Sequence, residues 1–159
     1  IDVGGGASTL ARDLLEEGYR DLTVLDISRS ALDVAIEAYG ALSTRIMWIH
    51  SDVLDCELSD TYTVWHDRAA FHFLTRKSDR KRYIDRLTQC VRPGGSIVIG
   101  VFAKSAPKKC SGLPVERYTL DALCSEFQAI AALASSKETI HVTPSGLEQP
   151  YQYARFTRF

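Results

Sequence analysis

The residues of this sequence that could do chemistry follow four short apolar runs. Glycines come directly after the first run, and acidic or imidazole side chains end the other three: Gly4, Gly5, Gly6, Asp26, Asp52, His66 and Asp67. The runs alternate with helical patterns, which predicts parallel strands. In such a sheet ligands bind outside the carboxyl ends of the strands. We therefore predict that these residues line one binding site.

The glycine turn differs from that of a dinucleotide-binding protein. The pattern G-x-G-x-x-G would need a third glycine at position 9, where the sequence has Thr9. Asp2 stands two residues before Gly4 and points a carboxylate at the same crevice. That charge is unfavourable beside a pyrophosphate and favourable beside an ammonium group. The turn therefore favours a ligand with an amine over one with phosphates.

Asp26 and Asp52 extend this prediction. Asp26 lies 22 positions after Gly4, the interval at which an acidic side chain accepts hydrogen bonds from a ribose diol. Asp52, followed by Val53, could receive the amino group of adenine. As alternatives, Asp26 could cap a helix, although Ser28 already suits that role, and Asp52 could begin a turn with Asp55. A ligand with an amine, a ribose and an adenine but no phosphate is S-adenosylmethionine.

The ordered segments "DVGGGAS", "LDIS", "SDV", "WHDRAAFHFL", "RPGG" and "CSGLPVERY" resemble those of class I S-adenosylmethionine-dependent methyltransferases. More narrowly, the chain is similar to small bacterial methyltransferase-domain proteins. The resemblance implies that Asp2, Gly4 and Gly6 hold the methionine part, Asp26 the ribose, and Ile27, Asp52 and Val53 the adenine. The full set of cofactor-binding residues that it implies is Asp2, Gly4, Gly5, Gly6, Ser8, Asp26, Ile27, Asp52, Val53 and His66. It places His66 and Asp67 near the reacting methyl group, where either could remove a proton from the acceptor.

The expected elements are strands at residues 1–3, 22–25, 46–49, 62–65 and 96–102, and helices at 8–17, 28–40, 78–91 and after Thr119. Two further strands, at 130–142 and 151–159, join at the turn Pro144-Ser145-Gly146 and must be antiparallel. The predicted fold class is α/β, a doubly wound Rossmann-like sheet that is mostly parallel with an antiparallel C-terminal hairpin strand. Glycines 94 and 95 are expected to form the turn into the strand at 96–102. The segment 104–114 is expected to be a loop that closes over the acceptor.

Composition limits the partners. The formal net charge of the 159 residues is −1, which predicts no binding to nucleic acid or to a membrane. A basic cluster between Arg76 and Arg86 is expected to be a solvated helix face. The four cysteines are far apart, which predicts reduced thiols and a cytoplasmic protein, and the spacing of the four histidines predicts no metal site.

The resembled proteins usually carry an N-terminal cover before the first strand. We therefore expect residues 1–159 to be one methyltransferase domain that is truncated at its N-terminus, with activity that the truncation could reduce. The predicted function is methyl transfer to a small-molecule or protein side-chain acceptor. The alternatives are a cofactor-binding or self-associating remnant, a possible homo-oligomer, and, less favoured, an NAD(P)-dependent reductase.

Overall fold

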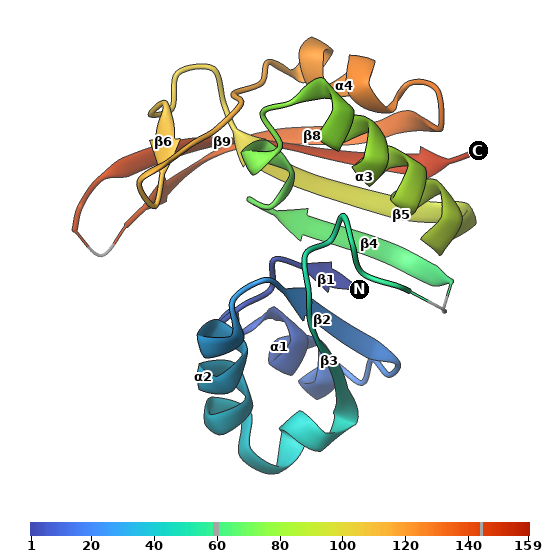
Figure 1. Ribbon diagram of the computed structural model, residues 1–159, viewed down its shortest axis with the longest axis vertical. Helices are drawn as coiled ribbons and strands as arrows, with labels where there is room; N and C mark the ends of the chain where they lie inside the picture. Colours follow the sequence, from blue (N-terminus) through green and yellow to red (C-terminus); the bar gives the residue numbers. More distant parts are fainter. Residues whose placement is uncertain (59–60, 144) are drawn as a thin grey trace. The chain divides into compact units, whose positions relative to one another are not determined.

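The computed structural model describes residues 1–58, 61–143 and 145–159. Its contacts divide the chain into two compact units, Ile1–Glu57 and Leu58–Phe159 (Figure 1). The first three strands belong to the first unit and the remaining strands to the second.

The first unit contains three parallel strands and two α-helices. The strands are β1 (Asp2–Val3), β2 (Leu22–Asp26) and β3 (Ile46–His50), with β2 in the middle. The helices are α1 (Leu10–Glu16) and α2 (Arg29–Tyr39), and a 3-10 turn, η1 (Gly40–Arg45), follows α2. Their core joins Ala11 and Leu15 of α1, Val24 of β2, and Leu32 and Ala35 of α2. The order strand, helix, strand, helix, strand is the one the sequence predicts.

The second unit contains four strands in the order β4-β5-β9-β8. They are β4 (Tyr62–Arg68), β5 (Val91–Phe102), β9 (Glu148–Arg158) and β8 (Ala131–Val142). β4 and β5 are parallel, whereas β5 with β9 and β9 with β8 are antiparallel, as predicted for the C-terminal hairpin. Between them lie a 3-10 turn, η2 (Phe71–Phe73), and the helices α3 (Lys77–Cys90) and α4 (Leu120–Phe127).

One face of this second sheet is covered by α3 and α4 (Figure 1). Trp65 of β4 meets Tyr83 of α3 edge-on with ring centroids 5.8 Å apart, and Phe156 of β9 stacks on Phe127 of α4 at 5.1 Å. Side chains alternate between the two faces of a strand, so the neighbours of these residues point to the opposite face. Val64 on that opposite face is 44% exposed.

Several boundaries differ from the expected ones. β4 continues to Arg68, so His66 and Asp67 lie inside the strand rather than after it. β5 begins at Val91, and glycines 94 and 95 form a bulge between the pairs Tyr62–Val91 and Val64–Ser96 instead of a turn before the strand.

Two further expectations were wrong in detail. α3 begins at Lys77 with Arg76 at the N-cap position, one residue before the expected start at residue 78. The segment 104–114 is not a plain loop, because it contains a short antiparallel ribbon of β6 (Lys109–Cys110) and β7 (Leu113–Pro114). At the turn of the C-terminal hairpin, Pro144 lies outside the described residues, and the Gly146 N–H donates to the Thr143 carbonyl at 2.8 Å.

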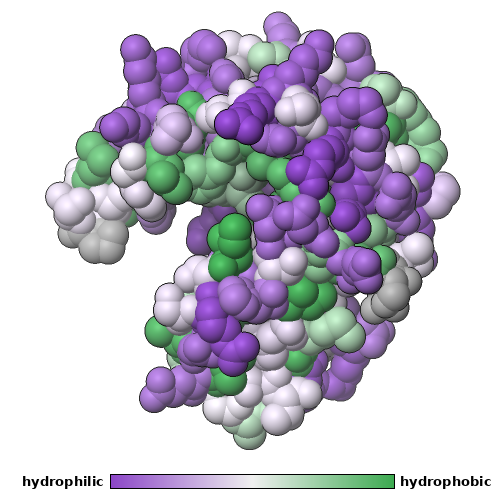
Figure 2. Space-filling model, viewed as in Figure 1, coloured by the Kyte–Doolittle hydropathy of each residue, from purple (hydrophilic) through white to green (hydrophobic). Residues whose placement is uncertain are grey.

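Most of the basic cluster is a solvated helix face, as expected, but the Arg80 side chain is only 14% exposed. Arg80 pairs with Glu126 of α4 at 2.8 Å, and Lys81 pairs with Asp85 one turn along α3 at 2.6 Å. The surface over α3 is mainly hydrophilic in the view of Figure 2. Partner carboxylates therefore reduce the attraction of this face for a polyanion.

Candidate functional site

The glycine turn of the first unit closes over the Asp2 carboxylate. Gly4 N–H donates to the Leu25 carbonyl at 2.8 Å, and Ser8 N–H donates to the Gly5 carbonyl at 2.8 Å, so the chain reverses sharply between β1 and α1. A Cβ atom on Gly5 would lie 2.7 Å from Asp2 Oδ2. Only a residue without a side chain can approach the carboxylate in this way.

Gly6 lies against the Asp26 carboxylate, as Gly5 lies against that of Asp2. Its φ angle is +40°, and a Cβ atom there would lie 2.9 Å from Asp26 Oδ2. The other carboxylate oxygen, Oδ1, accepts a hydrogen bond from the Ser28 N–H at 2.7 Å. Two carboxylates from neighbouring strands therefore lie against consecutive residues of one turn.

The alternative of Asp26 as the cap of α2 is wrong. Ser28 is the N-cap, because its hydroxyl accepts from the Ala31 N–H at 3.2 Å. Between the two lies Ile27, which is 67% exposed and whose carbonyl accepts a hydrogen bond from His50 Nε2 at 3.1 Å. An exposed aliphatic side chain beside a carboxylate suits a ligand with a flat apolar base next to a diol.

Asp52 begins a turn with Asp55, as the alternative interpretation of this residue predicted. Its Oδ1 accepts from the Leu54 N–H at 2.8 Å, and its carbonyl accepts from the N–H groups of Asp55 and Cys56. Val53 is 9% exposed. The adenine contact of Asp52 stays a prediction, and the turn fixes the direction of the carboxylate that would make it.

Ser8 has its polar atoms engaged within the unit. Its hydroxyl accepts from the Leu10 N–H at 3.2 Å, and its carbonyl accepts a short hydrogen bond from the Tyr39 hydroxyl. These bonds hold the end of the glycine turn to α1 and α2. Ser8 thus shapes the turn that contains Gly4, Gly5 and Gly6.

Asp67, predicted to be catalytic, is fully buried in the second unit. Its carboxylate accepts from the Ala70 N–H at 2.9 Å, from the Phe71 N–H at 3.1 Å and from the Tyr83 hydroxyl at 2.6 Å. Burial raises its pKa to about 6, although the Tyr83 and backbone hydrogen bonds oppose that shift. This geometry disfavours contact between Asp67 and an acceptor, and it favours a role in holding the end of β4 to η2 and α3.

His66 lies on the other face of β4 and is half-buried. Arg68 follows on that same face, since side chains alternate along a strand. Arg68 therefore points away from Asp67, so the two side chains do not form an ion pair. His66 stays the predicted catalytic residue with a side chain that the solvent can reach.

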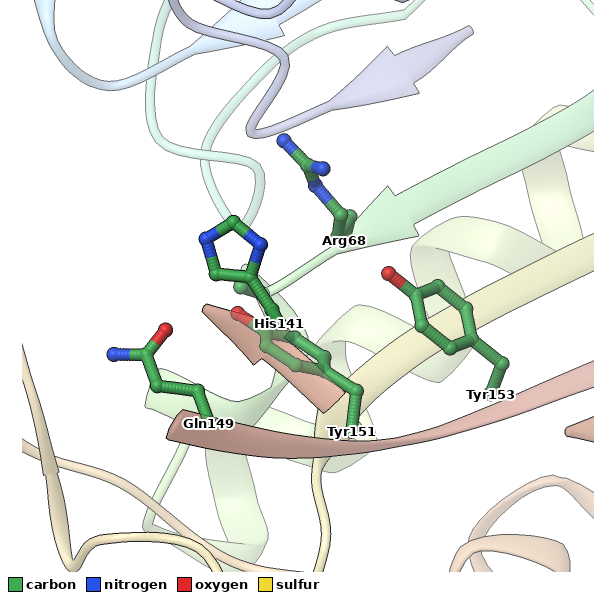
Figure 3. Close-up of a pocket in the computed structure, with 6 residues that line it drawn as sticks. Arg68, His141, Gln149, Tyr151 and Tyr153 are labelled. Carbon is green, nitrogen blue, oxygen red and sulfur yellow. The ribbon is translucent and has the colours of Figure 1, made fainter. Parts of the chain in front are cut away.

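A pocket of about 160 Å³ at the end of β4 was not predicted from the sequence (Figure 3). It is lined by Arg68 and Ala69 at the end of β4, and by residues of β8 and β9: His141, Gln149, Tyr151 and Tyr153. The alternation of Tyr151 and Tyr153 was visible in the sequence. It could be combined with Arg68 only once the register of β4, β5 and β9 was known.

The structure brings together no set of three His, Cys, Asp or Glu side chains that could hold a metal ion within the described residues. His72 is fully buried, and its Nδ1 accepts from the Phe102 N–H at 3.3 Å. Burial lowers its pKa to about 4, so the imidazole is neutral at pH 7. None of the cysteines, all four of which lie in the described part of the chain, forms a disulfide.

Comparison with known families adds the decisive observation. A family described as "Methyltransferase domain" matches residues 1–95, which include the whole glycine turn, Asp26 and Asp52. The chain belongs to this methyltransferase family. No curated protein sequence matches the chain significantly.

Solved structures give the fold of this methyltransferase. The chain resembles the N-methyltransferase NodS from Bradyrhizobium japonicum WM9 in complex with S-adenosyl-L-homocysteine (TM-score 0.74, 15% identity, covering 99% of this chain and 76% of that one). It also resembles an S-adenosylmethionine-dependent methyltransferase from Clostridium acetobutylicum ATCC 824 (TM-score 0.77, 8% identity, 98% and 82%). A third similar structure comes from work on the conversion of a disulfide bond into a thioacetal group during echinomycin biosynthesis (TM-score 0.79, 23% identity, 99% and 74%).

Family and fold together confirm the predicted Rossmann-like α/β methyltransferase. The glycine turn is compatible with S-adenosylmethionine, because the turn can approach a ligand closely and the carboxylates beneath it disfavour a pyrophosphate. No helix among the described residues is long and apolar enough to cross a membrane.

Proposed function

We propose that this chain transfers a methyl group to a small-molecule or protein side-chain acceptor. When bound, S-adenosylmethionine supplies a methyl group activated by its sulfonium. The protein then has to bind the cofactor, orient the acceptor, exclude water and, for a protonated acceptor, accept a proton.

The observation that carries the proposal is the contact of two carboxylates with one glycine turn. Asp2 lies under Gly5 and Asp26 lies against Gly6. In our proposal Asp2 and the turn, Gly4 to Ser8, hold the methionine part through its ammonium group. Asp26 accepts hydrogen bonds from the ribose hydroxyls.

The remaining predicted residues complete the cofactor site. Exposed Ile27 packs against the adenine, Val53 borders it, and the Asp52 carboxylate accepts from its amino group. These roles follow from the family resemblance together with the Asx-type turns that orient Asp26 and Asp52.

His66 is the residue that we assign to proton transfer, and Asp67 is assigned a positioning role. The solvent reaches the His66 ring, whereas three donors already surround the Asp67 carboxylate. Imidazole is the side chain that most often acts as a general base, so His66 is suited to accept a proton from an acceptor.

Calorimetric titration of the full chain tests the proposal. We expect saturable binding of S-adenosylhomocysteine and none of NADH. Asp26→Ala should weaken binding about 10–100-fold, because hydrogen bonds to a charged group contribute roughly 1.5–3 kcal/mol. The matched control is Asp33→Ala, which removes an exposed carboxylate that pairs with Arg29 on α2 and should leave the Kd unchanged.

Binding of NADH in place of S-adenosylhomocysteine would overturn the proposal in favour of a reductase. Equal Kd values for Asp26→Ala and Asp33→Ala would contradict the ribose role of Asp26. Binding without methyl transfer to any acceptor offered would favour the alternative of a cofactor-binding protein without catalysis.

A further inference from the structure

The pocket at the end of β4 lies entirely within the second unit. Arg68 and Ala69 form one side, and His141, Gln149, Tyr151 and Tyr153 from the β8–β9 hairpin form the other (Figure 3). β5 runs parallel to β4, and its last residue, Phe102, pairs with Tyr151. The pocket therefore stands at the carboxyl ends of two parallel strands, the edge at which ligands bind in open α/β sheets.

A glycine in the middle strand makes the pocket possible. Arg68 pairs with Gly100 on β5, and Gly100 pairs with Tyr153 on β9, so the three residues form one row across the sheet. A Cβ atom on Gly100 would lie 2.5 Å from Tyr153 Cε1. Because Gly100 has no side chain, the Tyr153 ring lies flat over β5, toward Arg68.

The aromatic wall is held in place by its neighbours. Tyr151 stacks on Tyr153 with ring centroids 5.8 Å apart and an interplanar angle of 27°. On its other side it meets Phe102 edge-on at 5.1 Å, and His141 edge-on at 6.4 Å. Rings packed in this way lose little conformational freedom when they bind a flat ligand.

The polar groups of the pocket suit an anion. Arg68 is exposed, and the structure gives it no carboxylate partner among the described residues. Burial raises the pKa of Tyr151 to about 12 and also raises the pKa of Tyr153, although Arg68 opposes both shifts. At neutral pH both phenols therefore keep their protons and can donate hydrogen bonds beside a fixed positive charge.

The volume limits the size of the ligand. An engineered apolar cavity of roughly 150 Å³ holds one benzene molecule. The pocket of about 160 Å³ is therefore large enough for one six-membered ring.

We infer that this pocket binds the methyl acceptor, and that it takes a single aromatic ring carrying a carboxylate. The inference rests on the proposed methyltransferase function. The ring stacks on Tyr151 and Tyr153, and the carboxylate accepts the two parallel N–H groups of the Arg68 guanidinium. Gln149 and His141 also line the pocket, where they can meet polar groups of the ligand.

Binding of benzoate to the full chain, measured by calorimetry and by the ring resonances of Tyr151 and Tyr153, tests this inference. We expect saturable binding of benzoate, shifts of both tyrosine resonances, and no binding of benzylamine, which has the same ring and the opposite charge. Arg68→Gln should weaken benzoate binding about 10–100-fold. Arg155→Gln is the matched control, because Arg155 is also exposed, lies on β9 outside the pocket and donates from its side chain to the Ser135 hydroxyl. The Kd of this variant should equal that of the unchanged chain.

Equal binding of benzoate and benzylamine would overturn the inference, as would equal effects of Arg68→Gln and Arg155→Gln. Absent shifts at both tyrosines would overturn it without reference to any variant. Titration with S-adenosylhomocysteine on the same samples separates the two proposals. If the chain binds S-adenosylhomocysteine but not benzoate, only the acceptor pocket is refuted. If it binds benzoate but not S-adenosylhomocysteine, the methyltransferase function is refuted.

Discussion

Asp67 accepts hydrogen bonds from two backbone N–H groups and from Tyr83, and Tyr83 in turn accepts from Trp65 Nε1 at 2.7 Å. All three side chains are fully buried. A buried polar group without a partner costs about 1–3 kcal/mol, so the Tyr83 hydroxyl matters to both of its neighbours. At the scale of the residue, this network explains why Asp67, although it is adjacent to His66, stabilises the fold and does not face the solvent.

Tyr83→Phe should therefore destabilise the chain by about 2–4 kcal/mol at pH 8. The change removes the donor to Asp67 and the acceptor for Trp65 while the ring remains. Urea unfolding gives the free energy, and Tyr19→Phe is the control because Tyr19 is 60% exposed. A loss for Tyr83→Phe no larger than that for Tyr19→Phe would contradict the role of the hydroxyl.

The same variant has a predictable pH dependence. The ordinary pKa of an aspartate is near 3.9, and burial raises that of Asp67 to about 6, so between these values the folded chain binds more protons than the unfolded one. Its contribution to stability therefore falls as the pH rises through this window. Removal of the Tyr83 hydroxyl raises the folded pKa further, and the loss of stability should be greater at pH 8 than at pH 5. Equal losses at the two pH values would mean that Asp67 does not titrate in this range.

At the scale of the element, short sequence patterns predicted correctly those features that depend only on neighbouring residues. Ser28 and Gly40 bound α2 as predicted, because a cap depends on the N–H groups and backbone angles beside it. The carboxylates of Asp2 in β1 and Asp26 in β2 also lie against the predicted glycine turn. By contrast, the burial of Asp67 depends on Tyr83 sixteen positions away, and the pocket depends on the pairing of residues 68, 100 and 153. Neither long-range relation is encoded in a short motif.

Gly100 offers a test of the row across β4, β5 and β9. Gly100→Ala should cost about 1–3 kcal/mol, because its methyl group would overlap the Tyr153 ring. In a Tyr153→Ala background the same change should cost less by at least about 1 kcal/mol, since the overlapping ring is gone. A double-mutant cycle measured by urea unfolding gives this coupling. Additive effects of the two substitutions would show that the ring does not lie over Gly100.

At the scale of the whole molecule, the proposed ligands act on different units. The predicted cofactor residues from Asp2 to Val53 belong to the first unit, whereas His66 and the acceptor pocket belong to the second. A ligand that binds only the folded form, at a concentration of about 100 Kd, stabilises that form by roughly 2.7 kcal/mol. Hydrogen exchange then slows about 100-fold for those amides that open only after the ligand has dissociated.

Hydrogen exchange of the full chain can therefore assign each ligand to its unit. With S-adenosylhomocysteine at about 100 Kd, the slowing should be greatest for amides of residues 1–57, above all in the glycine turn and at residues 26–28 and 52–54. With benzoate it should be greatest at the end of β4 and the start of β9, since the tyrosines and Arg68 lie there. NADH at the same concentration is the control and should change neither pattern. Protection spread equally over both units by either ligand would contradict this division, because it would mean that the ligand is held by residues other than those proposed.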